Sequence, residues 1–101
     1  MDRKVIISKT AQKKFDNLFE YLVDEWLERV KNKFIEKLDK SIHVIRTNPE
    51  AFPKSDKAKG LRRCVITKQT TLYFRYNNKR IEVVTIFDTR QNPNKLKKSL
   101  K

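Results

Sequence analysis

Two long stretches of apolar residues at helical spacing constrain this chain most, because each of them must bury one face. The first runs from Ala11 to Trp26 and the second from Val30 to Ile45, in steps of three and four residues. Together they are too long for one helix in a chain of 101 residues, so we expect an antiparallel helical hairpin. Asn48-Pro49 should end the second helix, because proline disfavours the helical conformation in the residue before it.

The segments on either side of the hairpin are predicted strands. A short β-branched run at 5–7 predicts a first strand that is buried on both faces. After a loop at 50–60, we expect three more strands at 61–68, 70–76 and 80–87. Asn77-Asn78 suits a tight turn between the last two strands, because asparagine tolerates positive φ.

These elements predict one α+β domain over residues 1–101. The N-terminal strand, the α-helical hairpin and three antiparallel strands should form one sheet packed on the hairpin. In the second of those three strands, Leu72 and Phe74 should face the hairpin, while Tyr73 and Arg75 face away from it. The expected core consists of Phe15, Leu18, Leu22, Trp26, Phe34, Leu38, Leu72, Phe74, Val83 and Ile86.

The charge of the chain points to a polyanionic partner. Its 25 lysines and arginines outnumber its 12 acidic residues, for a formal net charge of +13. Nucleic acid, a ribosome, an acidic protein or an acidic membrane surface would each fit this excess, and a merely lysine-rich surface is the alternative. No apolar stretch reaches the roughly 18 residues of a membrane span, and no signal-peptide pattern is visible. We therefore expect a cytoplasmic protein without a membrane partner.

The scarcity of some residue types excludes several kinds of site. One glycine cannot build a glycine-rich phosphate loop. One cysteine and one histidine leave no basis for a disulfide or a zinc site, so no metal and no cofactor are expected. Cys64 lies in an apolar run and should be a buried, inert thiol. His43 should lie on the surface of the second helix near its C-terminal end.

The candidate nucleic-acid surface is the sheet face opposite the hairpin. Arginine pairs bidentately with phosphate and tyrosine stacks on bases, so basic and aromatic residues there suit RNA. A solvated sheet face is the alternative. The candidate RNA-binding residues are Arg62, Tyr73 and Arg75, with Lys54, Lys57 and Lys59 in the preceding loop.

Arg90 follows the last strand and has two possible roles. It could hold a phosphate or stabilise transition-state charge, or it could pair with Asp88 as part of the structure.

The order of elements resembles that of the RelE/ParE superfamily of type II toxin–antitoxin toxins. The motifs that carry the resemblance are Asn48-Pro49-Glu50 with Phe52-Pro53, Gly60-Leu61-Arg62-Arg63, Leu72-Tyr73-Phe74-Arg75-Tyr76 and Asp88-Thr89-Arg90-Gln91-Asn92-Pro93. The resemblance implies a growth-arresting toxin that a cognate acidic antitoxin protein holds inactive.

The superfamily divides by mechanism, which leaves three hypotheses. RelE-like members cleave mRNA in the ribosomal A site. Arg63 (or its neighbour Arg62), Lys68 and Arg90 match their basic catalytic set by position. ParE-like members instead block DNA gyrase without cleaving nucleic acid. No tyrosine or histidine follows Arg90, and Asp88 stands where many ParE-like members carry a histidine. The hypotheses are ribosome-dependent mRNA cleavage, gyrase inhibition, and a basic nucleic-acid-binding module with no toxin role.

Overall fold

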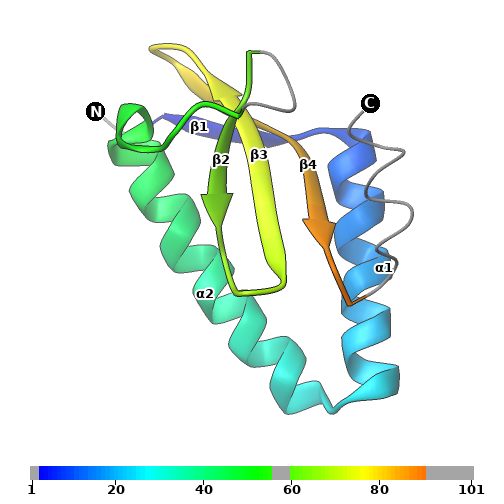
Figure 1. Cartoon of the computed structure of the whole chain (residues 1–101). Coiled ribbons are helices and arrows are strands. Elements are labelled where there is room, and N and C mark those ends of the chain that lie inside the picture. The colour runs from blue at the N-terminus through cyan, green and yellow to red at the C-terminus, as the bar shows by residue number, and fades with distance from the viewer. Residues whose placement is uncertain (1–2, 56–59, 91–101) are drawn as a thin grey trace.

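The computed structural model describes residues 3–55 and 60–90. Their order confirms the expected α+β arrangement of a strand, two helices and three strands (Figure 1). The elements are β1 (Lys4–Ile7), α1 (Lys9–Glu25), α2 (Glu28–Thr47), the 3-10 turn η1 (Pro49–Ala51), β2 (Arg62–Val65), β3 (Thr70–Tyr76) and β4 (Arg80–Asp88). None of the helices in these residues is both long and apolar enough to cross a membrane.

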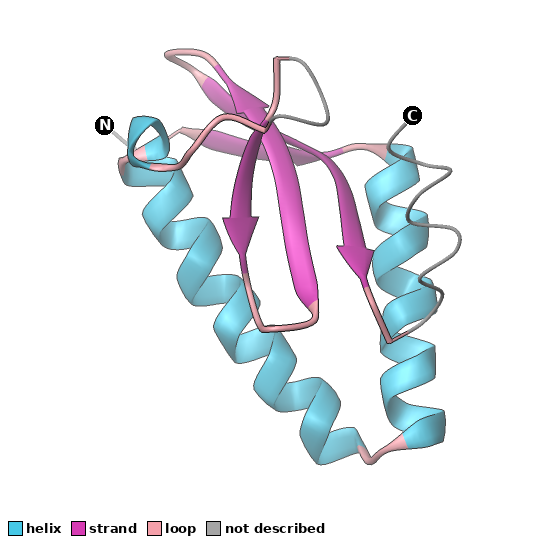
Figure 2. Ribbon diagram, in the orientation of Figure 1, coloured by secondary structure: helices cyan, strands magenta, loops and turns pink. Residues whose placement is uncertain are grey.

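The four strands form one mixed sheet in the order β1-β4-β3-β2. The pairs β2–β3 and β3–β4 are antiparallel, as expected, while β1 pairs with β4 in parallel. Both helices cover the same face of this sheet, and they meet at a corner beyond the ends of the strands (Figure 2). β4 occupies a central position in this sheet, between β1 and β3.

The expectation that the first strand is buried on both faces is wrong. β1 lies at an edge of the sheet, and Ile7 is 40% exposed. A strand at an edge has a neighbour on one side only, and its sequence alone does not distinguish this position from a central one. The residue that follows, Ser8, caps α1 by accepting a hydrogen bond from the backbone N–H of Ala11 at 3.0 Å.

The core forms between the helical hairpin and the sheet as the periodicity predicted, with one exception. The predicted core residues found buried are Phe15, Leu18, Leu22, Phe34, Leu38, Leu72, Phe74, Val83 and Ile86. The placement of Trp26 in the core is wrong, because its side chain is 54% exposed. Trp26 is the C-cap of α1, and this end of the helix extends past the strands (Figure 1).

We therefore expect Trp26→Ala to change the free energy of unfolding by less than about 1 kcal/mol, since exposed positions contribute little. Leu22 lies one helical turn earlier and is fully buried. Leu22→Ala should cost about 2–5 kcal/mol through lost burial and a cavity. Urea denaturation of both variants checks this, and equal losses would place Trp26 in the core after all.

The turn between β3 and β4 forms where it was expected, but side-chain hydrogen bonds rather than positive φ angles stabilise it. No described residue other than Gly60 has positive φ. The side-chain oxygen of Asn77 instead accepts hydrogen bonds from the N–H groups of Lys79 and Arg80, at 2.8 and 2.9 Å. An asparagine side chain that holds the backbone two residues ahead stabilises a turn without left-handed geometry.

Candidate functional site at the end of the sheet

Arg90 is held at the end of β4 by Asp88. Its Nε donates to Oδ1 of Asp88 at 3.1 Å, and a terminal guanidinium nitrogen donates to Oδ2 at 2.7 Å. The Asp88 carboxylate also accepts the backbone N–H of Arg90 at 2.9 Å and the hydroxyl of buried Thr70. The Asp88 side chain is fully buried, whereas that of Arg90 is 20% exposed. The pairing of Arg90 with Asp88, one of the two roles that the sequence left open, is therefore present in the structure.

The electrostatics of this pair keep both groups charged. Burial by itself would raise the pKa of Asp88, but hydrogen bonds from Arg90 and Thr70 outweigh it and hold the pKa below its usual value. The hydrogen bonds that Arg90 donates to Asp88 raise the pKa of its guanidinium. Neither group can exchange a proton near neutral pH, so the pair offers fixed charge and no acid–base chemistry.

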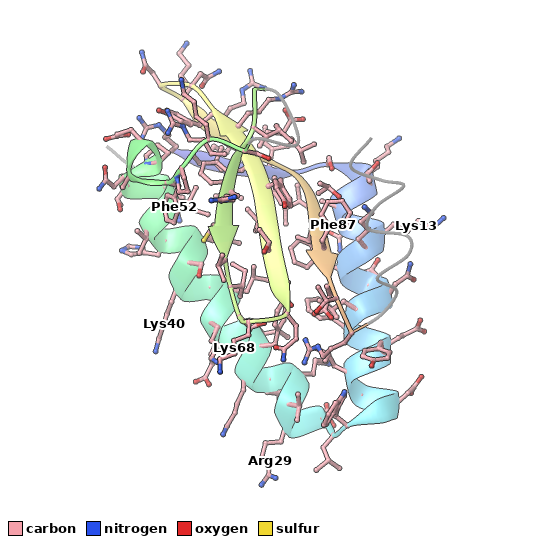
Figure 3. The ribbon with its side chains drawn as sticks, viewed as in Figure 1. Lys13, Arg29, Lys40, Phe52, Lys68 and Phe87 are labelled. Atoms are coloured by element: carbon pink, nitrogen blue, oxygen red, sulfur yellow. The ribbon has the colours of Figure 1, made fainter. Side chains whose placement is uncertain are left out.

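The β2–β3 turn brings Lys68 to the same end of the sheet. The backbone N–H of Thr89 donates to the carbonyl of Gln69 at 2.9 Å, which joins this turn to the residues after β4. The hydroxyl of Thr67 accepts from the N–H of Gln69 and stiffens the turn. Lys68 is exposed there (Figure 3). Lys68 and Arg90 thus occupy adjoining segments, as a shared site would require.

Arg63 lies farther along the sheet than the other two residues of the expected catalytic set. It pairs with Tyr73, three residues along β3 from Thr70. At a strand rise of about 3.4 Å per residue, this separation is roughly 10 Å along the sheet. Arg63 is exposed on the face away from the helices. The structure does not gather Arg63, Lys68 and Arg90 around one point.

Arg62 departs from the expectation that it shares a face with Tyr73 and Arg75. It pairs with buried Phe74, so it lies on the helix side of the sheet. Its guanidinium stacks 5.5 Å from the centre of the Tyr76 ring and donates to the carbonyl of Phe52 at 2.6 Å. These contacts make Arg62 a structural tie between β2 and the loop after α2.

Of the three loop lysines expected to bind RNA, the structure describes one, Lys54. Lys54 is exposed, and its backbone forms an isolated antiparallel β-bridge with Arg62 at the outer edge of β2. Lys57 and Lys59 lie outside the described residues.

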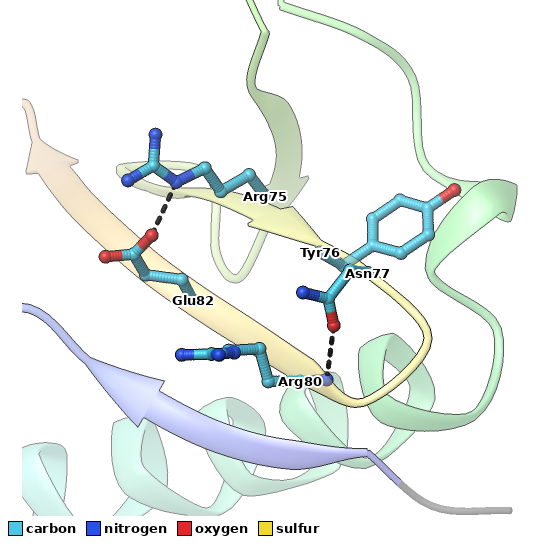
Figure 4. A pocket seen from close by; sticks show the side chains of 5 residues that line it. All are labelled: Arg75, Tyr76, Asn77, Arg80 and Glu82. Atoms are coloured by element: carbon cyan, nitrogen blue, oxygen red, sulfur yellow. Dashed lines mark hydrogen bonds and ion pairs between the residues drawn. The ribbon is translucent and has the colours of Figure 1, made fainter.

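Tyr73 and Arg75 lie on the face away from the helices, where Arg75 is exposed and Tyr73 is buried. Tyr73 is only 8% exposed, because its ring packs edge-on against Phe87 with 5.5 Å between ring centres. Arg75 forms an ion pair with Glu82 at 2.5 Å beside a shallow hollow that Arg80 also lines (Figure 4). A buried ring cannot stack on a base without moving, which weakens its candidacy for base contacts.

Lys14 also lies at this site, although its position in the sequence did not indicate it. Its Nζ donates to the Thr85 hydroxyl at 2.9 Å and lies 4.5 Å from the centre of the Phe87 ring. Burial lowers the pKa of Lys14. In the sequence Lys14 is one of several polar residues off the apolar stripe, and only the packing of α1 on β4 brings it to Phe87.

The histidine and the cysteine lie where they were expected. Cys64 is buried, and this burial raises the pKa of its thiol, so it is a poor nucleophile. His43 is exposed on α2. In the described part of the chain, no three histidine, cysteine or carboxylate side chains gather into a group that could hold a metal ion.

Comparisons with known proteins agree with this fold. Residues 5–93 match the family model described as the ParE toxin of the type II toxin–antitoxin system parDE. No curated protein sequence matches the chain significantly.

Several solved structures resemble the chain in fold at low sequence identity. One is the chromosomal ParDE toxin–antitoxin system from P. aeruginosa, with a TM-score of 0.72 and 12% identity over 85% of this chain and 95% of that one. Another is a YoeB/ParE toxin from Agrobacterium tumefaciens, with a TM-score of 0.61 and 17% identity over 84% and 96%. A third is the E. coli DinJ-YafQ toxin–antitoxin complex, with a TM-score of 0.59 and 14% identity over 91% and 98%.

Proposed function

The chain belongs to the ParE toxin family of type II toxin–antitoxin systems, and we propose that it arrests growth by binding DNA gyrase without cleaving nucleic acid. The observation that carries this proposal is the commitment of Arg90 to Asp88. A catalytic arginine must present its N–H groups to the phosphate that gains charge in the transition state. Here two guanidinium nitrogens already donate to a buried carboxylate.

The surroundings of Arg90 also favour binding over catalysis. Cleavage of RNA by its own 2′-hydroxyl needs a base and an acid within hydrogen-bond reach of the reacting atoms. The pKa of Asp88 is lowered and that of Arg90 is raised, which takes both away from neutrality. His43, the one histidine of the sequence, lies exposed on α2.

An acidic antitoxin is the partner that we propose to hold the toxin inactive. The DinJ-YafQ complex is a toxin of this fold bound to its antitoxin. The net charge of +13 would attract an acidic protein to this chain. On the sheet, the carboxylates of Glu82 and Asp88 are already paired with Arg75 and Arg90. Lys54, Arg63 and Lys68 are exposed and would be available to an acidic segment of the antitoxin.

The test is a pair of assays on the purified full-length toxin. We expect it to inhibit supercoiling of relaxed plasmid by DNA gyrase and to leave mRNA intact in a translation extract. Addition of the cognate antitoxin should restore supercoiling. Ribosome-dependent cleavage of mRNA with normal supercoiling would contradict the proposal.

Ribosome-dependent mRNA cleavage is the second candidate, and Lys14 is the observation that favours it. A lysine with a lowered pKa can take part in proton transfer, and Lys14 lies over the ring of Phe87 on the face that also carries Arg63. If the translation extract shows cleavage, Lys14→Met should reduce its rate by at least tenfold. Lys13→Met, a change on the adjacent residue of α1, is the matched control.

A further inference from the structure

The corner between α1 and α2 exposes three large apolar side chains close together. Val23 is 39% exposed, Trp26 is 54% exposed and Leu27 is 57% exposed. The corner projects beyond the strands, away from the part of the sheet that packs on the helices (Figures 1 and 2). Single exposed apolar residues are ordinary, but a contiguous group marks an interaction site, and tryptophan is enriched where protein interfaces gain most of their energy.

A groove continues this apolar group along the helices. It has a volume of about 410 Å³ and is lined by Asp16, Phe19, Glu20, Val23, Asp24 and Lys31. The ring of Phe19 stacks on Phe15 with 5.9 Å between centres and meets Phe34 edge-on at 6.1 Å. Phe19, which lines the groove, is therefore held in place by core residues. Such a preformed surface loses little conformational entropy when it binds a partner. We call Val23, Trp26, Leu27 and this groove the corner surface.

The corner surface differs in charge from the rest of the molecule. Residues 15–28 contain five carboxylates and no lysine or arginine, within a chain of net charge +13. Asp16, Glu20 and Asp24 line the groove, with Lys31 as the one cation among its lining residues. The last turn of α1 carries no basic residue, so Asp24 adds negative charge at the negative end of the helix dipole.

The local sequence at the corner also lacks residues that normally stabilise helix ends. Leu27 occupies the N-cap of α2 and makes no side-chain hydrogen bond there. Serine, threonine, aspartate or asparagine at this position would satisfy an unpaired N–H group. Departures from local preference that gather in one place are expected at functional sites rather than at random. The exposed tryptophan, the uncapped helix and the unfavourable carboxylate lie within four residues.

We propose that the corner surface docks the protein target of the toxin, which contacts it through an apolar patch rimmed by lysine or arginine. This inference rests on the proposed function, in which the toxin acts by binding a protein. Charge complementarity selects this occupant: the carboxylates of the groove repel nucleic acid and an acidic antitoxin, and they attract a basic protein surface. The target and the antitoxin therefore contact different parts of the toxin.

The first test removes the apolar contacts. Trp26→Ala and Leu27→Ser, each in the full-length toxin, should require at least tenfold more protein to inhibit supercoiling by purified gyrase, and should arrest growth correspondingly less. Leu27→Ser introduces a preferred N-cap residue, so it should not lower the melting temperature. Val44→Ala is the matched control, because Val44 is 46% exposed on α2 away from the corner and should keep full activity.

The second test reverses one charge in the groove and compares it with the same change of charge outside the groove. Glu20→Lys should weaken gyrase inhibition by at least tenfold, whereas Glu36→Lys, on an exposed position of α2, should leave it unchanged. Both variants gain two units of positive charge, so a general electrostatic effect would appear in both. A purified cognate antitoxin should bind all of these variants as tightly as it binds the wild type.

The outcomes separate this inference from the proposed function. If Trp26→Ala, Leu27→Ser and Glu20→Lys all arrest growth like the wild type, the inference is overturned whatever the gyrase assay shows. Loss of antitoxin binding in these variants would also overturn it, because the antitoxin would then be the occupant. If the wild type does not inhibit gyrase but the variants lose toxicity and keep the antitoxin, the docking surface is supported and gyrase is the wrong target.

Discussion

Replacement of Phe74 by alanine should cost about 3–5 kcal/mol of the free energy of unfolding, the largest loss that we expect from a single side chain here. Phe74 is fully buried in β3, between the hairpin and the loop that follows it. Its ring meets Phe52 edge-on at 5.7 Å and lies 6.5 Å from Tyr76. Truncation removes these contacts and leaves a cavity that a short helical hairpin and a four-stranded sheet cannot close without strain.

Chemical denaturation with a two-state fit measures this loss, and two variants calibrate it. Phe74→Leu keeps most of the apolar volume and should cost less than half as much as Phe74→Ala. Val65→Ala changes an apolar residue that is 64% exposed on β2, and its effect should stay below about 0.5 kcal/mol. A loss below about 1 kcal/mol for Phe74→Ala would mean that β3 does not turn this residue toward the helices.

The elements of this fold could be predicted because each one carries its own period. The apolar residues of the helices recur at three and four positions, and those of β3 alternate, so both identify the buried face without knowledge of the neighbours. The neighbours themselves are not encoded in this way. The edge position of β1 depends on strand order, and the exposure of Trp26 depends on where the sheet ends along α1.

The candidate site shows the same limit more sharply. Asp88 and Arg90 are two residues apart in the sequence, so their pairing could be proposed from the sequence as one of two roles for Arg90. Thr70 and Lys14 could not be assigned in this way, because they join the site only through the β3–β4 register and the packing of α1 on β4. A register shift between Tyr73 and Phe74 leaves Val84 without a partner in β3, and alternation alone does not reveal such a bulge.

The pair at the end of β4 gives the second large effect. Arg90→Ala should destabilise the protein by about 2–3 kcal/mol, since it leaves the buried Asp88 carboxylate without its cation. Asp88→Asn should cost less, about 1–2 kcal/mol, because the amide oxygen still accepts from Thr70. The double variant Asp88→Asn/Arg90→Leu should be more stable than the sum of the two losses predicts, since no uncompensated charge remains buried.

The pair also sets a pH dependence whose sign follows from the lowered pKa of Asp88. A carboxyl whose pKa is lower in the folded state than in the unfolded state stabilises the fold above its unfolded pKa of about 4. That contribution is lost as the pH falls through the lower, folded-state pKa. The wild type should therefore lose stability relative to Asp88→Asn as the pH falls below about 4, and parallel acid titrations of the two proteins would contradict the assignment.

Toxicity then distinguishes the two roles of Arg90. Under the proposed function Arg90 positions the end of β4 and touches no phosphate, so Arg90→Ala should still inhibit gyrase and arrest growth once its folded fraction is taken into account. Arg90→Lys should recover little of the stability, because lysine cannot donate to both carboxylate oxygens at once. If soluble, folded Arg90→Ala has no toxicity, Arg90 contacts the target directly, and its pairing with Asp88 is the resting state of a functional side chain.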